Sequence, residues 1–89
     1  MAKYIQVLTT TGTKTSADKM AKPLIGKGLA ACVQVLGPVS STYGWKGKVE
    51  HGSEWLCMVK TTGSKYKAVE RAIRANHSYE IPEIISLPI

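Results

Sequence analysis

The stretch STYGWKGKVEHGSEWLCMVKT, residues 41–61, decides the fold because it contains a hairpin turn and one complete long strand. Lys46-Gly47 is typical of a two-residue hairpin loop, so we expect the chain to reverse there. The returning strand runs from Lys48 to about Thr61, and His51-Gly52-Ser53 is predicted to form a bulge or bend within it. This ribbon is long, since strands usually have about 5–6 residues. A hairpin that outgrows its own sheet leaves backbone groups unpaired, which a second chain can satisfy.

The strand before the turn begins near Leu29 and reads LAACVQVL before Gly37-Pro38 interrupts it. A turn at residues 46 and 47 places Cys57 opposite Leu36 and Cys32 opposite Thr61. The two cysteines are then offset by roughly 13 Å along the ribbon, whereas a disulfide needs Cα atoms within about 7 Å. We therefore expect neither a disulfide nor a metal site shared by the two thiols.

The segment upstream of the hairpin predicts a strand and then a helix. Lys3–Thr9 is extended with apolar residues on both faces, which indicates a central strand. Thr15 followed by Asp18 resembles an N-terminal capping box, and Gly26 and Gly28 indicate the helix end. One apolar stripe at helical spacing consists of Ala17, Met20, Ala21, Leu24 and Ile25.

Pro23 conflicts with that helix. A proline in a helix interior removes one hydrogen bond and clashes with the preceding turn, at a cost of about 3 kcal/mol. A kink or a short, weakened helix is the expected result.

The segment downstream of the hairpin predicts a second helix and a last strand. Ser64 is a candidate cap, and Tyr66, Val69 and Ile73 form a buried stripe that ends near Asn76. A strand over Glu83–Leu87 follows a loop. The order β-α-β-β-α-β predicts one α+β domain over residues 1–89, with the ferredoxin-like fold. Its antiparallel sheet carries both helices on one face and contains one long hairpin.

Composition restricts the classes of protein. The chain has 89 residues, of which 44% are hydrophobic, and a formal net charge of +6. The lysines are scattered from Lys3 to Lys67 without a dense run, which favours solvated surface charge over an anionic partner. No signal-like start or apolar run of about 20 residues is present, so we expect a cytoplasmic protein without a membrane partner and with reduced cysteines.

The motifs for catalysis and for base recognition are missing. No G-x-S-x-G, P-loop or H-E-x-x-H pattern occurs, so we expect no enzyme. The third predicted strand lacks the aromatic signature of an RNA-recognition motif, which predicts no nucleic-acid partner. His77, with Glu80 and Glu83 close behind it, is the better metal-ligand candidate of the two histidines, although a lone loop histidine is more often a surface group.

Three separated stretches resemble one known family. LAACV at residues 29–33, YGWKGK at 43–48 and HSYEIPEII at 77–85 are similar in order and spacing to segments of the CutA family. The likeness extends from about Tyr4 to Ile89.

The resemblance implies a ferredoxin-like protomer in a homotrimer in which the long hairpins pair between chains. It also implies tolerance of copper and other divalent cations, with no required cofactor and with copper or another divalent cation as an optional ligand. His77 matches the histidine of the family's HPYE-like segment, while Thr9 stands where bacterial relatives can carry a cysteine and Asn76 where some carry a second histidine. Two of three proposed copper ligands are therefore missing.

An inter-subunit cleft, similar to that of PII-type signalling trimers, is the second implied site. We predict that it is lined by Trp45, Lys60, Tyr79 and Glu83, although a plain salt bridge between Lys60 and Glu83 is an open alternative. Two functions follow: a trimeric divalent-metal tolerance protein that acts by binding, or a trimeric scaffold or small-ligand sensor that uses the cleft.

Overall fold

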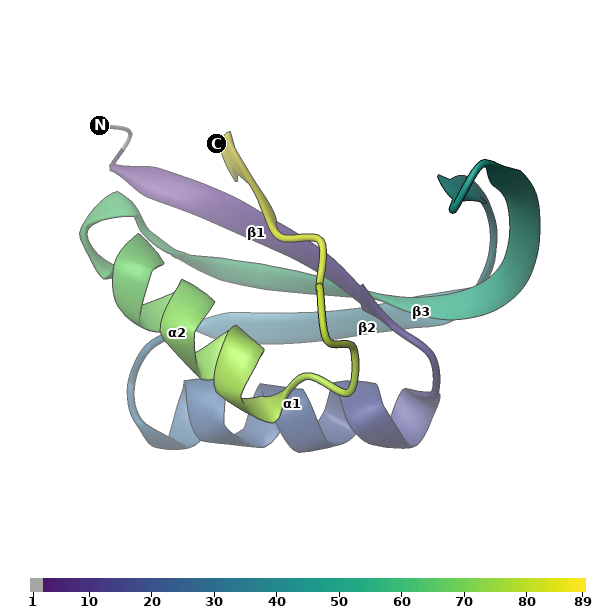
Figure 1. Cartoon of the computed structure of the whole chain (residues 1–89). Helices are drawn as coiled ribbons and strands as arrows, with labels where there is room; N and C mark the ends of the chain where they lie inside the picture. Colours follow the sequence, from purple (N-terminus) through teal and green to yellow (C-terminus); the bar gives the residue numbers. More distant parts are fainter. Residues whose placement is uncertain (1–2) are drawn as a thin grey trace.

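A four-stranded antiparallel sheet with two helices on one face makes up the computed structural model, which describes residues 3–89 (Figure 1). The order of elements confirms the predicted ferredoxin-like α+β class. In chain order, the elements are β1 (Tyr4–Thr11), α1 (Lys14–Gly26), β2 (Cys32–Trp45), β3 (Lys48–Thr62), the 3-10 turn η1 (Gly63–Lys65), α2 (Tyr66–Asn76) and β4 (Ile85–Pro88).

The strands lie in the order β2-β3-β1-β4, so β1 is central, as its two-sided apolar pattern predicts. β1 continues two residues beyond the predicted end at Thr9, because Thr10 and Thr11 pair with Leu56 and Trp55 of β3. β4 begins at Ile85, two residues later than predicted, where its pairing with Leu8 begins.

The hairpin turn lies at Lys46-Gly47, as predicted, with Trp45 paired to Lys48. Both turn residues have positive φ, 51° and 77°, which matches a type I′ turn and its right-handed twist. Of the predicted bulge or bend at residues 51–53, the bulge is wrong, because these residues pair regularly with 40–42. The register shifts instead between Leu36 and Val39.

That bulge includes a glycine with no room for a side chain. A Cβ on Gly37 would lie 2.7 Å from the ring of Trp55. Glycine at this point lets the bulged backbone approach the indole, which packs in turn against the core. The shift also changes the predicted pairs by one residue, so Cys57 faces Val35 and Cys32 faces Lys60.

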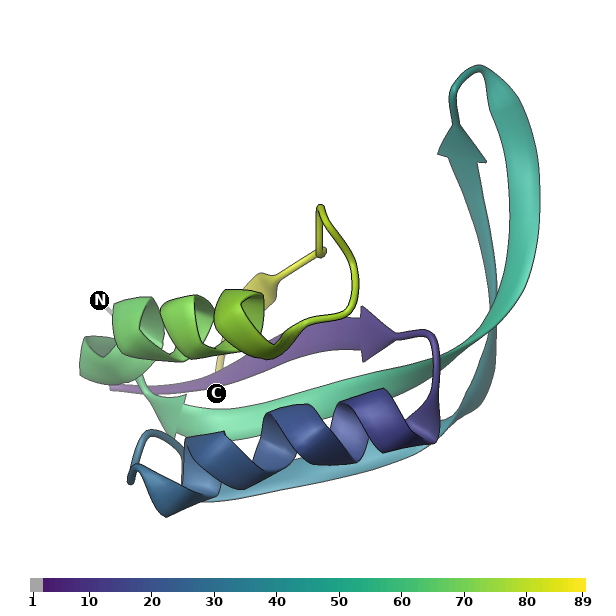
Figure 2. The ribbon, with the colours of Figure 1, turned by 60° about the horizontal axis from the view of Figure 1, so that its bottom comes forward.

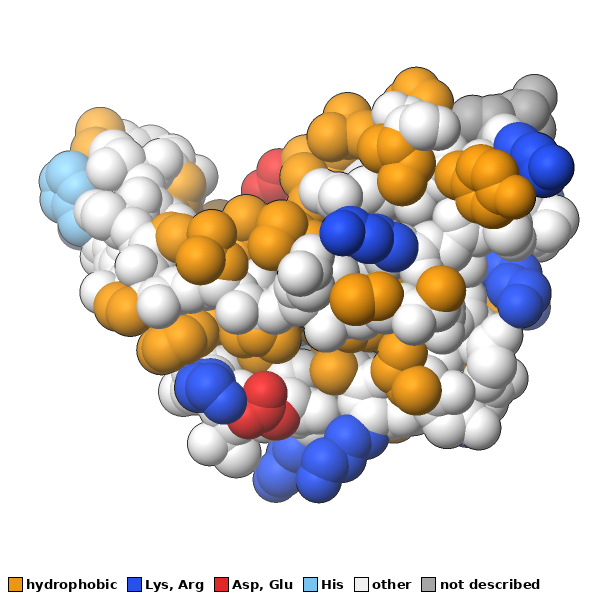
Figure 3. Space-filling model, turned by 180° about the vertical axis from the view of Figure 1, so that it is seen from behind, with side chains coloured by type: hydrophobic (Ala, Val, Ile, Leu, Met, Phe, Trp, Pro, Cys, Tyr) orange, Lys and Arg blue, Asp and Glu red, His pale blue; other side chains and the backbone are white. Residues whose placement is uncertain are grey.

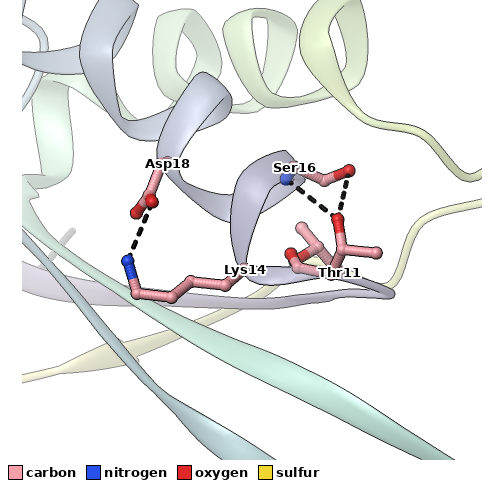
Figure 4. Close-up of polar contacts among 5 residues, drawn as sticks. Thr11, Lys14, Ser16 and Asp18 are labelled. Carbon is pink, nitrogen blue, oxygen red and sulfur yellow. Dashed lines mark hydrogen bonds and ion pairs between the residues drawn. The ribbon is translucent and has the colours of Figure 1, made fainter.

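α1 begins two residues earlier than the capping-box pattern suggests. Thr13, not Thr15, is the N-cap, and its hydroxyl accepts a hydrogen bond from the backbone N–H of Ser16 at 3.0 Å. Lys14 and Asp18 form an ion pair of 2.9 Å on the first turn (Figure 4).

The expected shortening of α1 at Pro23 does not occur. The helix has 13 residues and continues to Gly26, and the N–H of Lys27 closes the last turn on the carbonyl of Pro23 at 2.9 Å. Leu24, directly after the proline, is fully buried. Its burial offsets the one lost hydrogen bond.

α2 starts differently from the prediction and ends where predicted. A 3-10 turn at Gly63–Lys65 precedes it, and the Ser64 hydroxyl bonds the hydroxyl of Thr62 at 3.1 Å instead of capping the helix. Val69 and Ile73 are its buried stripe, and the helix ends at Asn76.

The core lies between the sheet and the two helices, which cover the same face (Figures 1 and 2). We call this the helix face and the other the open face. The buried hydrophobic residues of the core are Ile5, Val7, Ala17, Met20, Leu24, Cys57, Val59, Val69 and Ile73. On the strands these alternate with residues of the open face, where apolar side chains are spread over the surface (Figure 3).

Beyond the bulge, the hairpin leaves the sheet and curves away from it as an arm (Figure 2). The arm comprises residues 40–53. Its side chains are exposed or half-buried, and Tyr43, Trp45 and Val49 are 48%, 52% and 72% exposed. The ribbon therefore does not fold back on its own sheet.

Candidate functional site

A groove of about 920 Å³ lies where the arm leaves the sheet, beside the loop that follows α2. Its lining consists of Thr10, residues 40–45, Glu54, residues 78–81 and Glu83. Hydroxyl groups, aromatic rings and carboxylates therefore share one surface.

Glu54 is the most strongly held polar group of the groove. Its carboxylate accepts hydrogen bonds from the hydroxyl of Tyr79 at 2.7 Å and from that of Thr10 at 3.1 Å. Partial burial acts to raise the pKa of Glu54, but hydrogen bonds from Tyr79, Ser41 and Thr10 together lower it below 4.5. The carboxylate is therefore ionised at neutral pH and fixed in direction.

Tyr79 joins the loop to the β-ribbon through the same contact. Burial and the neighbouring Glu54 carboxylate raise the pKa of Tyr79 to about 12, because both disfavour a phenolate. A Cβ on Gly12 would lie 3.4 Å from the hydroxyl of Tyr79, so the β1–α1 turn packs closely against the ring.

His77 fastens the start of this loop to the end of β1. Its Nδ1 accepts a hydrogen bond from the backbone N–H of Tyr79 at 3.0 Å, so Nε2 carries the ring proton. Nε2 donates to the carbonyl oxygen of Thr10 at 2.8 Å and lies 3.3 Å from the hydroxyl of Thr9. Burial lowers the pKa of His77, which agrees with a neutral ring.

The residues around His77 do not fit a copper or zinc ion within one chain. Both ring nitrogens are already hydrogen-bonded, and the side-chain atom that lies 3.3 Å from Nε2 is the hydroxyl of Thr9, which is a poorer ligand for copper or zinc than a thiolate. Asn76 turns away and donates to the carbonyl of Ala72 at 2.8 Å. Over residues 3–89, no three His, Cys, Asp or Glu side chains are grouped as a metal site. A metal at His77 stays a prediction that needs donors from a second chain.

The structure brings three of the four predicted cleft residues together. Trp45, Tyr79 and Glu83 line the groove, whereas Lys60 lines a smaller hollow of about 290 Å³ beside Tyr4. The ion pairs of the described residues are Lys14–Asp18 and Glu70–Arg74, so the Lys60–Glu83 bridge does not form within one chain. A cleft that contains both residues requires a neighbouring chain and stays a prediction.

Sequence reasoning missed Glu54. The available signal was a carboxylate two residues before Leu56 on the same face of a strand, next to a tryptophan. Its partner Tyr79 lies 25 positions away in a loop, which no periodic pattern can place.

Both cysteines are free. Cys57 is fully buried under the helices, and burial raises its pKa to about 11. Cys32 is half-buried on the open face. The expected absence of a disulfide between them agrees with this placement on opposite faces of the sheet.

No helix within residues 3–89 combines the length and apolar character that crossing a membrane requires.

Comparison with known proteins gives one family. Residues 5–89 match the CutA1 divalent ion tolerance protein family. A protein CutA homolog of Xenopus laevis is 47% identical over 75 residues, which are 84% of this chain and 50% of the frog protein. The divalent-cation tolerance protein CutA of Thermus thermophilus is 39% identical over 93% of this chain and 81% of its own length. The chain spans about half the length of the first curated relatives that it matches.

Solved structures agree on the fold. The crystal structure of CutA1 from Oryza sativa has a TM-score of 0.94 at 38% identity and covers 99% of this chain and 81% of the rice chain. A structure from Archaeoglobus fulgidus, described as the periplasmic divalent cation tolerance protein CutA, has a TM-score of 0.93 at 36% identity. It covers 97% of this chain and 83% of its own.

Proposed function

The chain belongs to the CutA1 divalent ion tolerance family, and we propose that it acts in divalent-cation tolerance as a homotrimer, by binding and not by catalysis. Tolerance of divalent cations comes from the names of its relatives. The trimer is the form that the family resemblance implies. The observation that carries the proposal is the uncovered apolar face of the sheet.

The open face is more apolar than a solvated sheet face. Leu36, Ile85 and Leu87 are 55%, 43% and 45% exposed, and the register places Leu8, Leu56 and Met58 on the same face. Antiparallel sheets that face water on one side usually carry polar residues there. A contiguous apolar patch on a small domain marks an interaction surface. A second and third copy of this chain would bury it.

The arm supports association for a second reason. A two-stranded ribbon by itself is marginally stable in water. In the part of the chain that the structure describes, residues 40–53 pair only with each other, and no further strand of the sheet pairs with them. Exposed Tyr43 and Trp45 provide contact area for a neighbouring chain. We propose that the arms of neighbouring chains pack on one another.

Sedimentation equilibrium tests the assembly. The expected mass is about three times the 9.6 kDa of the monomer. Leu36→Glu on the open face should dissociate the assembly, because three carboxylates would be buried without partners. Ile25→Glu is the matched control, since Ile25 is 47% exposed on α1, on the other side of the sheet. A monodisperse wild-type monomer, or equal loss of assembly in both variants, would contradict the trimer.

A divalent cation, copper in particular, is the finer part of this function. The donors of one chain do not suffice, so we propose that any such site forms between chains and includes His77. Calorimetric titration with copper and zinc, on the wild type and on His77→Ala, tests this. Heat that saturates in the wild type and disappears in the variant supports the site. Equal traces for the two proteins remove His77 from it.

A second candidate function rests on the groove. Its volume of about 920 Å³ falls in the range of small-molecule pockets. A trimeric scaffold or small-ligand sensor would use it as the cleft predicted from Trp45, Tyr79 and Glu83. Thermal-shift screening of the wild type against Glu54→Gln separates the two functions, since a groove ligand depends on Glu54 and a metal at His77 does not.

We also propose a cytoplasmic location for the chain. Relatives are not uniform in this respect: the rice and Arabidopsis thaliana proteins are named chloroplastic, and the Archaeoglobus fulgidus structure is described as periplasmic. Cell fractionation of the native host, with antibody detection, tests the location.

A further inference from the structure

The net charge of the chain lies on its helix layer. Eight of the 12 lysines and arginines belong to α1 with its C-cap, to η1 and to α2. The eight are Lys14, Lys19, Lys22, Lys27, Lys65, Lys67, Arg71 and Arg74. Subtracting the two carboxylates of these segments, Asp18 and Glu70, leaves +6, which equals the formal charge of the whole chain. The other four cations and four carboxylates cancel.

The helical period turns five of these cations away from the sheet. Ala17, Met20 and Leu24 are the buried side of α1, so Lys19 and Lys22 lie on its outward side. In the same way, Val69 and Ile73 are the buried side of α2. Its outward side carries Lys67, Arg71 and Arg74, and all five cations are exposed.

The two helices lie side by side on the sheet (Figure 2). Their outward cations therefore belong to the same side of the molecule. The local carboxylates neutralise little of this charge. Asp18 pairs with Lys14 at 2.9 Å and Glu70 lies 3.7 Å from Arg74, each within its own helix. Lysines that are scattered in the sequence are thus gathered by the fold, which the linear pattern does not reveal.

The chemistry of this surface fits phosphates better than lipid or unpaired bases. Of the residues on these helices, Ile25 is the one exposed large hydrophobic side chain, whereas helices that lie in membranes carry a broad apolar face. Tyr66, the aromatic residue of α2, is half-buried and bonds to Glu70 at 3.5 Å, so it offers no stacking platform of the kind that single strands require. Exposed lysine and arginine side chains are the groups that contact duplex phosphates, and such contacts do not depend on the base sequence.

We propose that the outward face of α1 and α2 binds the phosphate backbone of duplex nucleic acid, independently of base sequence. This proposal departs from the sequence prediction of no nucleic-acid partner, which rested on the missing RNA-recognition signature and on lysines that are scattered in the sequence, because the fold gathers those lysines on the helix layer. This surface lies on the opposite side of the sheet from the open face, so the proposed trimer leaves it accessible. It requires neither the trimer nor a metal.

Fluorescence anisotropy with a short fluorescein-labelled DNA duplex tests the proposal. The wild type should bind at about 50 mM salt and lose affinity linearly on a double-logarithmic salt plot. The double variant Lys22→Glu/Arg71→Glu should bind at least about tenfold more weakly, with a slope reduced by about two, one for each lost phosphate contact. The control Lys46→Glu/Lys48→Glu makes the same change of charge at the tip of the arm and should stay within about threefold of the wild type.

Three outcomes would overturn the proposal. The first is no duplex binding by the wild type at low salt. The second is an equal loss in both double variants, which would mean that net charge alone drives binding. The third is tighter binding to phosphatidylserine-containing vesicles than to the duplex at the same salt. Circular dichroism of each variant confirms that the exposed substitutions leave the fold intact.

Discussion

The two faces of the sheet are built from the same strands and differ in what covers them. Val7 and Val59 have no exposed surface beneath the helices, while their neighbours Leu8 and Met58, one residue along, lie half-buried on the open face. The helices therefore cover one face within the chain, whereas the other face is apolar and uncovered. In the proposed trimer, folding and association would therefore use alternate residues of the same strands, and they could be perturbed separately.

The largest expected difference between the faces is thiol reactivity. Cys57 is buried on the helix face with a pKa of about 11, whereas Cys32 is half-buried on the open face. Since the thiolate is the nucleophile, Cys57 should react with Ellman's reagent at least about 100-fold more slowly than Cys32. The single-thiol variants Cys32→Ser and Cys57→Ser allow each rate to be measured in dilute protein at pH 8.

Raising the protein concentration sharpens the same comparison. Association should protect Cys32 and leave the rate of Cys57 unchanged. Equal rates for the two thiols in dilute native protein would contradict the division of the sheet into a covered and an uncovered face.

Truncation of core leucine is the next largest effect. Leu24 is fully buried between α1 and the sheet, so Leu24→Ala should lower the free energy of unfolding by about 2–5 kcal/mol. Leu36→Ala, on the open face, should cost less and should cost less still on dilution, because the contacts of Leu36 in the proposed trimer are between chains. Urea titrations at several protein concentrations measure both. A loss at Leu24 that depends on concentration would assign that residue to the interface.

A smaller effect tests where the helix layer begins. Thr13→Ala removes the side chain that caps α1 and should lower the free energy of unfolding by about 1 kcal/mol. Thr15→Ala is the matched control, an exposed threonine that the sequence pattern favours as the cap and the structure does not. It should change stability by less than about 0.5 kcal/mol. A larger loss of unfolding free energy in Thr15→Ala than in Thr13→Ala, measured by urea titration, would identify Thr15 as the cap.

The smallest expected effect is at the end of the open face, in the groove. The pKa of Glu54 is lowered in the folded chain, so its stabilising effect is present above the unfolded value near 4.5 and is lost as the pH falls through the folded value. Tyr79→Phe removes the 2.7 Å hydrogen bond, which should lower the free energy of unfolding by about 1 kcal/mol or less at pH 7. The free energy of unfolding of this variant should also fall less steeply than that of the wild type between pH 6 and pH 3.

Unfolding followed by circular dichroism across that range measures the effect. Tyr43→Phe, a change of the same kind in the same groove, serves as the control. An unchanged acid limb in Tyr79→Phe would mean that the hydroxyl does not hold the carboxylate.

Much of the fold could be predicted because local patterns dictate it. The two-residue turn at Lys46-Gly47 has positive φ at both residues, so its place in the sequence is indicated by these two neighbouring positions alone. The stripe of Ala17, Met20 and Leu24 fixes the buried side of α1 in the same local way. The bulge could not be placed, since both Gly37 and the glycine at 52 are turn-like in sequence, and the choice between them depends on the position of the Trp55 ring across the ribbon.

The site was less predictable than the fold. Trp45, Tyr79 and Glu83 share a groove within one chain, and they belong to stretches that stand out in sequence, while the predicted cleft between subunits stays a prediction. Glu54 and Thr10 were not foreseen, since a hydrogen bond between two strands and a distant loop leaves no periodic trace. Lys60 is separated from Glu83 because the alternation of β3 places it over the middle of the sheet, opposite Cys32 and Gln6.

The register shift at Gly37-Pro38 has a consequence for how this hairpin can change length over generations. Before the shift, even-numbered residues of β2 share a side with Leu56; after it, odd-numbered ones such as Val39, Tyr43 and Trp45 do. A single insertion or deletion between the shift and the turn would move the even-numbered and odd-numbered side chains to opposite faces of the ribbon, and Tyr43 and Trp45 with them. Lineages that lengthen or shorten the ribbon must therefore gain or lose residues in cross-strand couples, one from each strand.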